Sequence, residues 1–166
     1  MSDADLTDLD EDELRSVLWQ DSLSAAALYA VAPQALGGIV VRGHAGPVRE
    51  AWLERAKRFL PEDAPLRKIP GSISDDRLLG GLDLSATLSQ GRAVASTGLL
   101  SEANGGTVVL PMAERLAART TAHLLTALDT GWISVEREGL SRKLPACFGF
   151  IALDEGIGPD ERPPSG

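Results

Sequence analysis

Apolar residues recur at helical spacing over much of the chain, and this pattern predicts several amphipathic helices. The first pattern covers residues 11–32, as one or two helices, and ends before Pro33. The longest later pattern covers residues 113–130, and Gly131 supplies its end signal. Shorter helical patterns cover residues 49–60, 82–90 and 99–104.

Short runs without polar residues lie between these helices and are typical of strands buried on both faces of a parallel sheet. The candidate strands of this kind are Ile39–Val41, Thr107–Leu110 and Phe148–Leu153. Residues 61–76 hold three prolines and are predicted as a loop, within which the charged segment Arg67–Ile69 is a further candidate strand. Residues 132–135 and 140–144 flank a charged turn that ends in Gly139, which predicts an antiparallel β-hairpin. Alternating strands and helices indicate an α/β fold with a mostly parallel sheet flanked by helices and a hairpin insert.

Composition narrows the class of protein. The chain has 166 residues, 43% of them apolar, which is enough for a domain with its own core. A net charge of −8 argues against nucleic acid as a partner, because phosphate binding needs clustered Lys and Arg. No apolar run approaches the ~20 residues of a membrane span. The acidic N-terminus differs from a basic secretion signal, so we expect a cytoplasmic protein.

Acidic residues gather at both ends of the chain, within residues 3–13 and 154–161, and such runs are usually solvated. We therefore predict an acidic flexible N-terminus over residues 1–10 and the α/β domain over 11–155. Residues 156–166 are rich in proline and glycine and are predicted as a flexible tail.

The turn after the first strand carries the first candidate chemistry. It reads Gly43-His44-Ala45-Gly46-Pro47-Val48-Arg49-Glu50. A working phosphate-binding loop reads G-x-x-x-x-G-K-[ST], in which backbone N–H groups hold phosphates, lysine contacts the β- and γ-phosphates and the hydroxyl binds Mg²⁺. Gly43 keeps the first position. Val48, Arg49 and Glu50 replace the second glycine, the lysine and the hydroxyl residue.

These replacements disfavour nucleotide binding. Val48 adds a Cβ atom where a glycine would let the backbone approach a pyrophosphate. A carboxylate at Glu50, roughly 4 Å from a phosphate oxygen, costs about 4 kcal/mol at an effective dielectric near 20, which a pair with Arg49 would offset in part. With Gly43 and Gly46, these residues form a degenerate nucleotide-binding loop. A plain strand–turn–helix without nucleotide-binding ancestry is the alternative.

A second ATPase element is also missing. P-loop ATPases place an acidic residue at the end of a buried strand to hold Mg²⁺, commonly with a glutamate that activates water. Here Pro111 and Met112 follow the strand 107–110. Glu114 comes later and is expected to be a solvated residue at a helix start. Two losses at separate places predict an ATPase-like protein that does not hydrolyse ATP.

Four segments then resemble the AAA+ subunits of magnesium chelatase. Two of them are Gly37–Gly43, at the entry to the loop, and Gly98–Gly106. The third, Asp76–Asp83, is similar to the family's D-R-L-[LV]-G-[GS]-[LI]-D stretch. The fourth, Val135–Phe148, is similar to the family's hairpin, which reads V-E-R-[DE]-G-x-S-x-x-x-P-A-x-F. The resemblance covers roughly residues 23–163 in one order. Among these subunits, the chain resembles the D subunits of bacteriochlorophyll-making photosynthetic bacteria, whose ATPase motifs are commonly broken.

The resemblance implies a P-loop NTPase-like AAA+ core that is truncated before its helical lid. Glu155 stands at the family's sensor asparagine, and a carboxylate cannot donate a hydrogen bond to a phosphate as an amide does. We therefore expect no catalytic residues, no metal site and no cofactor on this chain, with ATP and Mg²⁺ on a partner ATPase subunit.

The resemblance also implies a role. The chain would assemble with the ATPase subunit and, in the full complex, with the porphyrin-binding large subunit in a hetero-oligomeric ring. That complex inserts Mg²⁺ into protoporphyrin IX, a ligase reaction that forms nitrogen–metal bonds for chlorophyll and bacteriochlorophyll. Glu136, Arg137 and Glu138 at the hairpin tip are the candidate partner contacts, with a solvated turn as the alternative. A weakly ATP-binding AAA+ domain and a regulatory interaction domain outside tetrapyrrole synthesis are the alternative functions.

Four further side chains have expected environments. Cys147 lies in an apolar stretch and is expected to be a buried thiol. Trp52 is expected in the core, because large aromatic side chains dominate cores. His44 is expected to be a solvated loop residue and His123 a surface or boundary residue.

Overall fold

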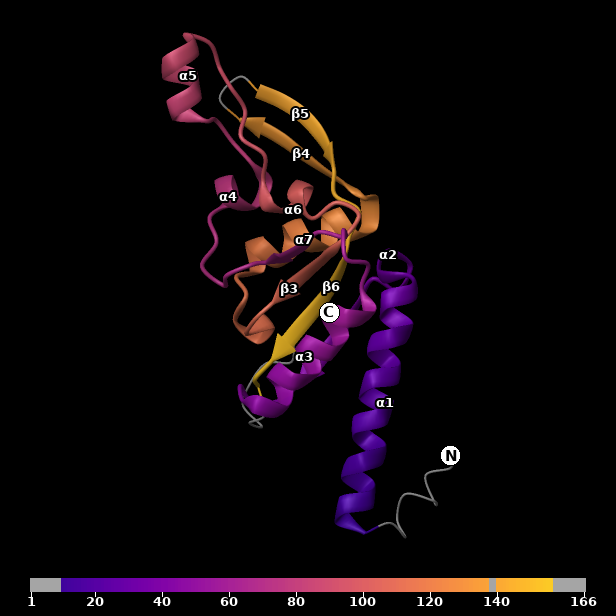
Figure 1. Cartoon of the computed structure of the whole chain (residues 1–166). Coiled ribbons are helices and arrows are strands. Elements are labelled where there is room, and N and C mark those ends of the chain that lie inside the picture. Colours follow the sequence, from indigo (N-terminus) through magenta and orange to yellow (C-terminus); the bar gives the residue numbers. More distant parts are fainter. Residues whose placement is uncertain (1–9, 138–139, 157–166) are drawn as a thin grey trace.

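A four-stranded parallel sheet forms the centre of the molecule, in a computed structural model that describes residues 10–137 and 140–156 (Figure 1). Its strand order is β1-β6-β3-β2. The strands are β1 (Gly38–Arg42), β2 (Leu66–Lys68), β3 (Thr107–Leu110) and β6 (Gly149–Asp154). All neighbouring pairs in this sheet are parallel, which confirms the predicted α/β class. Every residue of β3 is buried, as its unbroken apolar pattern predicted.

Two layers of helices cover this sheet. On one face, α1 (Glu11–Val31) and α3 (Pro47–Phe59) enclose an apolar cluster with Val109 and Ile151 of the sheet. On the other face, α7 (Ala118–Thr130) packs with Val108 and Leu110 in a second cluster. Val108, Val109 and Leu110 thus face alternate sides of the sheet, so successive side chains of one strand serve both cores.

The remaining elements are short helices and the hairpin. The helices are α2 (Pro33–Leu36), α4 (Asp75–Leu79), α5 (Leu84–Gln90), α6 (Leu99–Glu102) and the 3-10 helix η2 (Ala113–Arg115). The hairpin strands are β4 (Trp132–Arg137) and β5 (Leu140–Pro145), which pair antiparallel as predicted. Figure 1 shows the hairpin and α5 together at the end of the molecule opposite the free end of α1. Within the described residues, no helix is long and apolar enough to cross a membrane.

The predicted helix over residues 113–130 is wrong in its first turns. The chain after β3 forms η2, and α7 begins only at Ala118. Met112 adopts a left-handed backbone conformation, with φ of 50°, which a residue with a side chain adopts rarely. This reversal separates the strand from the helix and turns the chain back over the end of the sheet.

Cys147 is exposed, so the predicted buried thiol is wrong. Its neighbours Ala146 and Phe148 are both buried, with exposed fractions of 0% and 2%. In extended backbone, neighbouring side chains point in opposite directions, and Cys147 therefore faces solvent between two inward-facing residues. Trp52 is buried as predicted, and its Nε1 donates to the Ser22 carbonyl of α1 at 3.2 Å.

The end of α1 is attached to the sheet at Tyr29. Its hydroxyl lies 3.0 Å from Thr107 Oγ1, and both residues are buried. Gly149 passes so close that an added Cβ would lie 2.6 Å from the Tyr29 hydroxyl and 2.6 Å from the Pro33 carbonyl oxygen. Glycine is therefore required where α1, α2 and β6 meet.

The burial of Tyr29 predicts a stability change at high pH. Burial raises the pKa of Tyr29 to about 12, above its ordinary value of 10, and the hydrogen bond to Thr107 opposes this only in part. The unfolded chain therefore loses the phenol proton first, and the free energy of unfolding should fall by about 2–3 kcal/mol as the pH rises from 10 to 12.

Tyr29→Phe should be less stable than the parent at pH 8, because it leaves the Thr107 hydroxyl without its partner, and should lose less stability at high pH. Urea unfolding of both proteins at pH 8 and pH 11 measures the difference. Tyr29 is the sole tyrosine, so absorbance of the ionised phenol follows the same transition directly. Parallel pH profiles for the two proteins would contradict the assignment.

Candidate functional site

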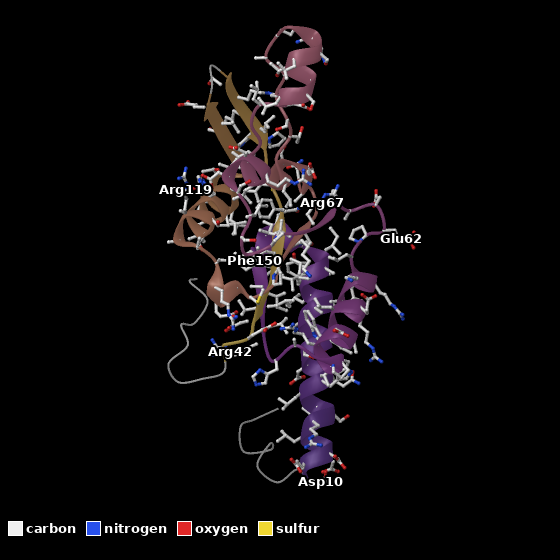
Figure 2. All side chains as sticks on the ribbon, turned by 90° about the vertical axis from the view of Figure 1, so that its left-hand side faces the viewer. Asp10, Arg42, Glu62, Arg67, Arg119 and Phe150 are labelled. Atoms are coloured by element: carbon white, nitrogen blue, oxygen red, sulfur yellow. The ribbon has the colours of Figure 1, made fainter. Side chains whose placement is uncertain are left out.

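The carboxyl ends of β1, β6 and β3 meet at one end of the sheet, where the predicted loop joins β1 to α3. Figure 2 labels Arg42, which lies at this end, and Phe150, which lies further back along β6. Because ligands of parallel α/β sheets bind at the carboxyl ends of the strands, this end is the candidate site.

The strand–turn–helix around the loop is present as predicted. The Gly43 N–H donates to the Asp154 carbonyl at 2.9 Å, and α3 begins at Pro47 after Gly46 in extended conformation. An added Cβ at Gly43 or Gly46 would meet no atom within 4 Å, so crowding within the chain does not explain these glycines. Pro47 has no N–H, which removes one donor from the set that a phosphate-binding helix start offers. Val48 is 70% exposed.

Arg49 pairs with Glu155 and not with Glu50. Arg49 Nη1 lies 2.8 Å from Glu155 Oε1, and the two side chains are 13% and 24% exposed. The same nitrogen donates to the Gly43 carbonyl at 3.2 Å. Glu50 is exposed. The residue at the lysine position and the residue at the sensor position, far apart in the sequence, therefore neutralise each other across the loop.

Glu114 belongs to the same cluster, so its predicted solvated position is wrong. Its side chain is 6% exposed, and Oε2 accepts a hydrogen bond from the Glu155 N–H at 3.1 Å. Arg115 Nε lies 3.2 Å from Glu114 Oε1. The reversal at Met112 and the turn of η2 bring Glu114 against the end of β6. Pro111 and Met112 follow β3, and no carboxylate occupies those two positions.

Asp154 is a site residue that the sequence analysis assigned to a solvated acidic end, and this was wrong. It is fully buried at the end of β6, where Oδ2 accepts from Arg42 Nε at 2.8 Å. Its Oδ1 accepts from the Gly156 N–H at 2.9 Å. Arg42 is its register partner on β1. The signal that could have found Asp154 is an acidic residue directly after the apolar run of β6.

The three arginines of this end, Arg42, Arg49 and Arg115, are thus all paired with carboxylates, so none offers a free positive charge to a ligand. A cavity of about 520 Å³ lies beside the loop between α1, β1 and α3. Its lining includes Trp19, Ile39, Val41, Trp52 and Arg49. Over residues 10–137 and 140–156, no group of three or more His, Cys, Asp or Glu side chains is arranged to hold a metal ion.

The predicted partner contacts on the hairpin lie away from the loop. Glu136 is exposed on β4, and Arg137 ends that strand, whereas Glu138 lies outside the described residues. Figure 1 places the hairpin at the other end of the molecule from the loop after β1. His44 is exposed, as expected, and His123 is partly buried, with Nε2 4.0 Å from Asp75 Oδ1.

Comparison with known proteins connects this chain to a family. The sequence matches no protein-family model. It is 37% identical over 127 residues to the magnesium-chelatase 67 kDa subunit of Chlorobaculum parvum, a match that covers 76% of this chain and 20% of that protein. It is 39% identical over 148 residues to the magnesium-chelatase 60 kDa subunit of Cereibacter sphaeroides, covering 89% of this chain and 23% of that protein.

A solved structure has the same fold. A chain in a complex between subunits BchI and BchD of magnesium chelatase, based on cryo-electron microscopy at 7.5 Å, superimposes with a TM-score of 0.65 and 25% identity. The match covers 86% of this chain and 54% of that chain. The chain spans about a fifth of the length of the two relatives described above. The sequence identity over most of the chain and the shared AAA+ fold show that it belongs to the family of magnesium chelatase D subunits.

Proposed function

We propose that the chain is a non-hydrolysing AAA+ module of a magnesium chelatase D subunit that assembles with the active ATPase subunit. In this proposal ATP and Mg²⁺ bind to the partner. The whole cytoplasmic complex, a hetero-oligomeric ring with the porphyrin-binding subunit, uses ATP hydrolysis to insert Mg²⁺ into protoporphyrin IX. The observation that carries the proposal is the ion pair between Arg49 and Glu155.

The residues at the loop do not fit a Mg-ATP site. A triphosphate there would meet Glu155 and Glu50 as like charges, while Arg49 is already paired. Like charges roughly 4 Å apart repel by about 4 kcal/mol at an effective dielectric near 20. Neither Pro111 nor Met112 can ligate Mg²⁺ or activate water, so hydrolysis lacks a second requirement as well.

The ion pair also gives the loop a fixed position without nucleotide. Arg49 contacts Gly43 at the start of the loop and Glu155 at the end of β6. Glu155 in turn is hydrogen-bonded to Glu114 of η2. The segments that follow β1, β3 and β6 are therefore tied together by side chains. This supports a module whose shape does not depend on a nucleotide cycle.

A weakly ATP-binding domain is the second candidate function. It is favoured by the cavity of about 520 Å³ beside the loop, whose lining combines Arg49 with two tryptophans, Trp19 and Trp52. An aromatic base and a phosphate have complementary chemistry to such a lining. Nucleotide titrations separate the two candidates.

Removing one member of the ion pair should destabilise the domain. Glu155→Gln leaves the Arg49 guanidinium, 13% exposed, without its counter-charge, and the free energy of unfolding should fall by about 1–3 kcal/mol. The matched control is Glu54→Gln, which removes an ion pair at the surface: Glu54 is 65% exposed and its partner Lys57 is 42% exposed. This variant should leave the urea midpoint nearly unchanged. Equal midpoints for the two variants would show that the pair does not hold the loop.

Restoring the loop should restore nucleotide binding but not hydrolysis. We expect Val48→Gly, Arg49→Lys, Glu50→Ser and Glu155→Asn together to bind MgATP more tightly than the parent in calorimetry. A control variant with the three loop substitutions and the parental Glu155 should bind MgATP less tightly than the variant with all four substitutions, because its new lysine meets the Glu155 carboxylate. Phosphate release should stay absent in all variants. ATP hydrolysis by the parent chain at about 1 s⁻¹, the low end of typical enzymes, would refute the proposal.

The assembly itself is tested by binding of this chain to the purified ATPase subunit, followed by analytical ultracentrifugation. We expect a stable complex, and we expect Glu136→Lys on the hairpin to weaken it without unfolding, because exposed substitutions usually change stability by about 0.5 kcal/mol or less. Asp21→Lys on α1 is the matched charge reversal at an exposed site away from the hairpin. No complex with the parent would contradict the proposed function. Equal losses of affinity for the ATPase subunit in the two variants would show that the hairpin is not part of the interface.

A further inference from the structure

The outer edge of β2 has no neighbouring strand among the residues that the structure describes, because β2 is last in the order β1-β6-β3-β2. Towards the sheet, the Pro65 carbonyl accepts from Thr107 N–H at 2.8 Å and the Ile69 N–H donates to Val109 at 2.9 Å. Hydrogen-bonding directions alternate along a strand, so the backbone groups of Leu66 and Lys68 point outward. They form a short edge without a neighbouring strand, on which the Leu66 carbonyl accepts a long hydrogen bond of 3.4 Å from the Arg67 side chain.

Two positively charged side chains line a cleft at the end of this edge. Lys68 and Arg77 border a cavity of about 370 Å³, together with Ser72 and Ser74. Within the described ranges, no carboxylate lies in ion-pair distance of either cation. Other cations of the described residues, such as Arg58 and Arg92, are also outside any ion pair; Lys68 and Arg77 differ from them because both border one cleft beside an open strand edge.

The nearby charges have other partners, and these charges include the exposed Asp76 directly before Arg77. Arg67 of the same strand is 3.4 Å from Glu102 of α6, and Figure 2 shows Arg67 on this side of the molecule. Asp75 at the start of α4 lies 2.6 Å from Arg119 of α7. The unpaired cations at the open edge therefore form a local positive patch, which attracts acidic ligands.

We propose that the β2 edge binds an acidic, extended peptide segment of a partner protein. The peptide would add a strand through hydrogen bonds to the outward backbone groups of Leu66 and Lys68. Its carboxylates would pair with the Lys68 ammonium and the Arg77 guanidinium, and they supply the specificity. This inference does not depend on the proposed function.

The geometry favours a peptide over a small anion. Lys68, Ser72, Ser74 and Arg77 are all exposed, so the cleft has no enclosed cradle for a phosphate. The Arg77 N–H, which could face an anion, donates instead to Ser74 Oγ at 3.4 Å. The open strand edge is an additional feature that an extended backbone uses and an isolated phosphate does not. A different role for Lys68 is to discourage edge pairing between copies of the chain, and the experiment also tests that role.

The probe is an acetylated and amidated hexapeptide of alternating Glu and Thr, titrated into the ¹⁵N-labelled chain at low salt. We expect saturable amide shifts at residues 66–69 and 72–77, with weaker binding as salt rises. The same peptide with Gln in place of Glu should bind at least about tenfold more weakly. Lys68→Gln and Arg77→Gln should each lower the affinity about three- to fivefold.

The backbone contribution is separated by Lys68→Pro. Both Lys68→Gln and Lys68→Pro remove the charge, but only proline removes the outward N–H, which an edge strand tolerates. We expect Lys68→Pro to bind at least about threefold more weakly than Lys68→Gln, with both variants folded by circular dichroism. Arg92→Gln, an exposed cation beyond α5, is the matched control and should bind as the parent does.

Four outcomes would overturn the proposal. Equal binding of the Glu and Gln peptides, or an equal loss in Arg92→Gln, would show that the patch does not select acidic chains. Inorganic phosphate that shifts the same amides as strongly as the peptide would show a small-anion site instead. Absence of any saturable amide shift with the Glu peptide would show that the edge does not bind it, and would favour the role of Lys68 in discouraging edge pairing between copies of the chain.

Discussion

The Arg49–Glu155 ion pair couples two positions that a nucleotide site would use separately. Taking a charge partly out of water is unfavourable unless its partner is present, so each residue requires the other. A change of Arg49 towards lysine would leave a shorter cation facing Glu155, and a change of Glu155 towards an amide would leave the guanidinium without a counter-charge. Replacing either residue alone is therefore unfavourable, and Glu114 and Gly43 extend the same constraint to η2 and the loop.

The fold was predictable where one physical signal dominated. The unbroken apolar run at residues 107–110 could hardly be anything other than a buried strand, and it is β3. The hairpin followed from two runs separated by a charged turn with glycine. The start of the helix after β3 was not predictable, because it depends on a left-handed conformation at Met112 that its side chain disfavours. Cys147 was misjudged because hydrophobic neighbours do not show which way an extended residue points.

At the candidate site, the strand–turn–helix was predictable from the sequence, but the ion pairs were not. The residues of the degenerate loop could be read from their spacing, whereas the partner of Arg49 depends on which strand lies beside β1. Sequence proximity suggested Glu50, but the parallel pairing of β1 with β6 brings Asp154 and Glu155 to the loop. The same pairing explains why Asp154 is buried beside Arg42, although its position before an acidic tail suggested a solvated residue. Contacts between distant segments require the strand order, which no local pattern contains.

The distribution of paired and unpaired charge indicates where the chain can still bind something. At the loop, Arg42 and Arg49 are both used internally, and a ligand there must first break an ion pair. Lys68 and Arg77 line the cleft beside β2, and Lys143 on the hairpin lies 5.0 Å from the ring of Trp132, which is 44% exposed. A partner meets these groups without disrupting an internal ion pair, so less of its interaction energy is lost. We therefore expect partners to bind at the sheet edge and the hairpin, while the loop after β1 holds three strand ends together.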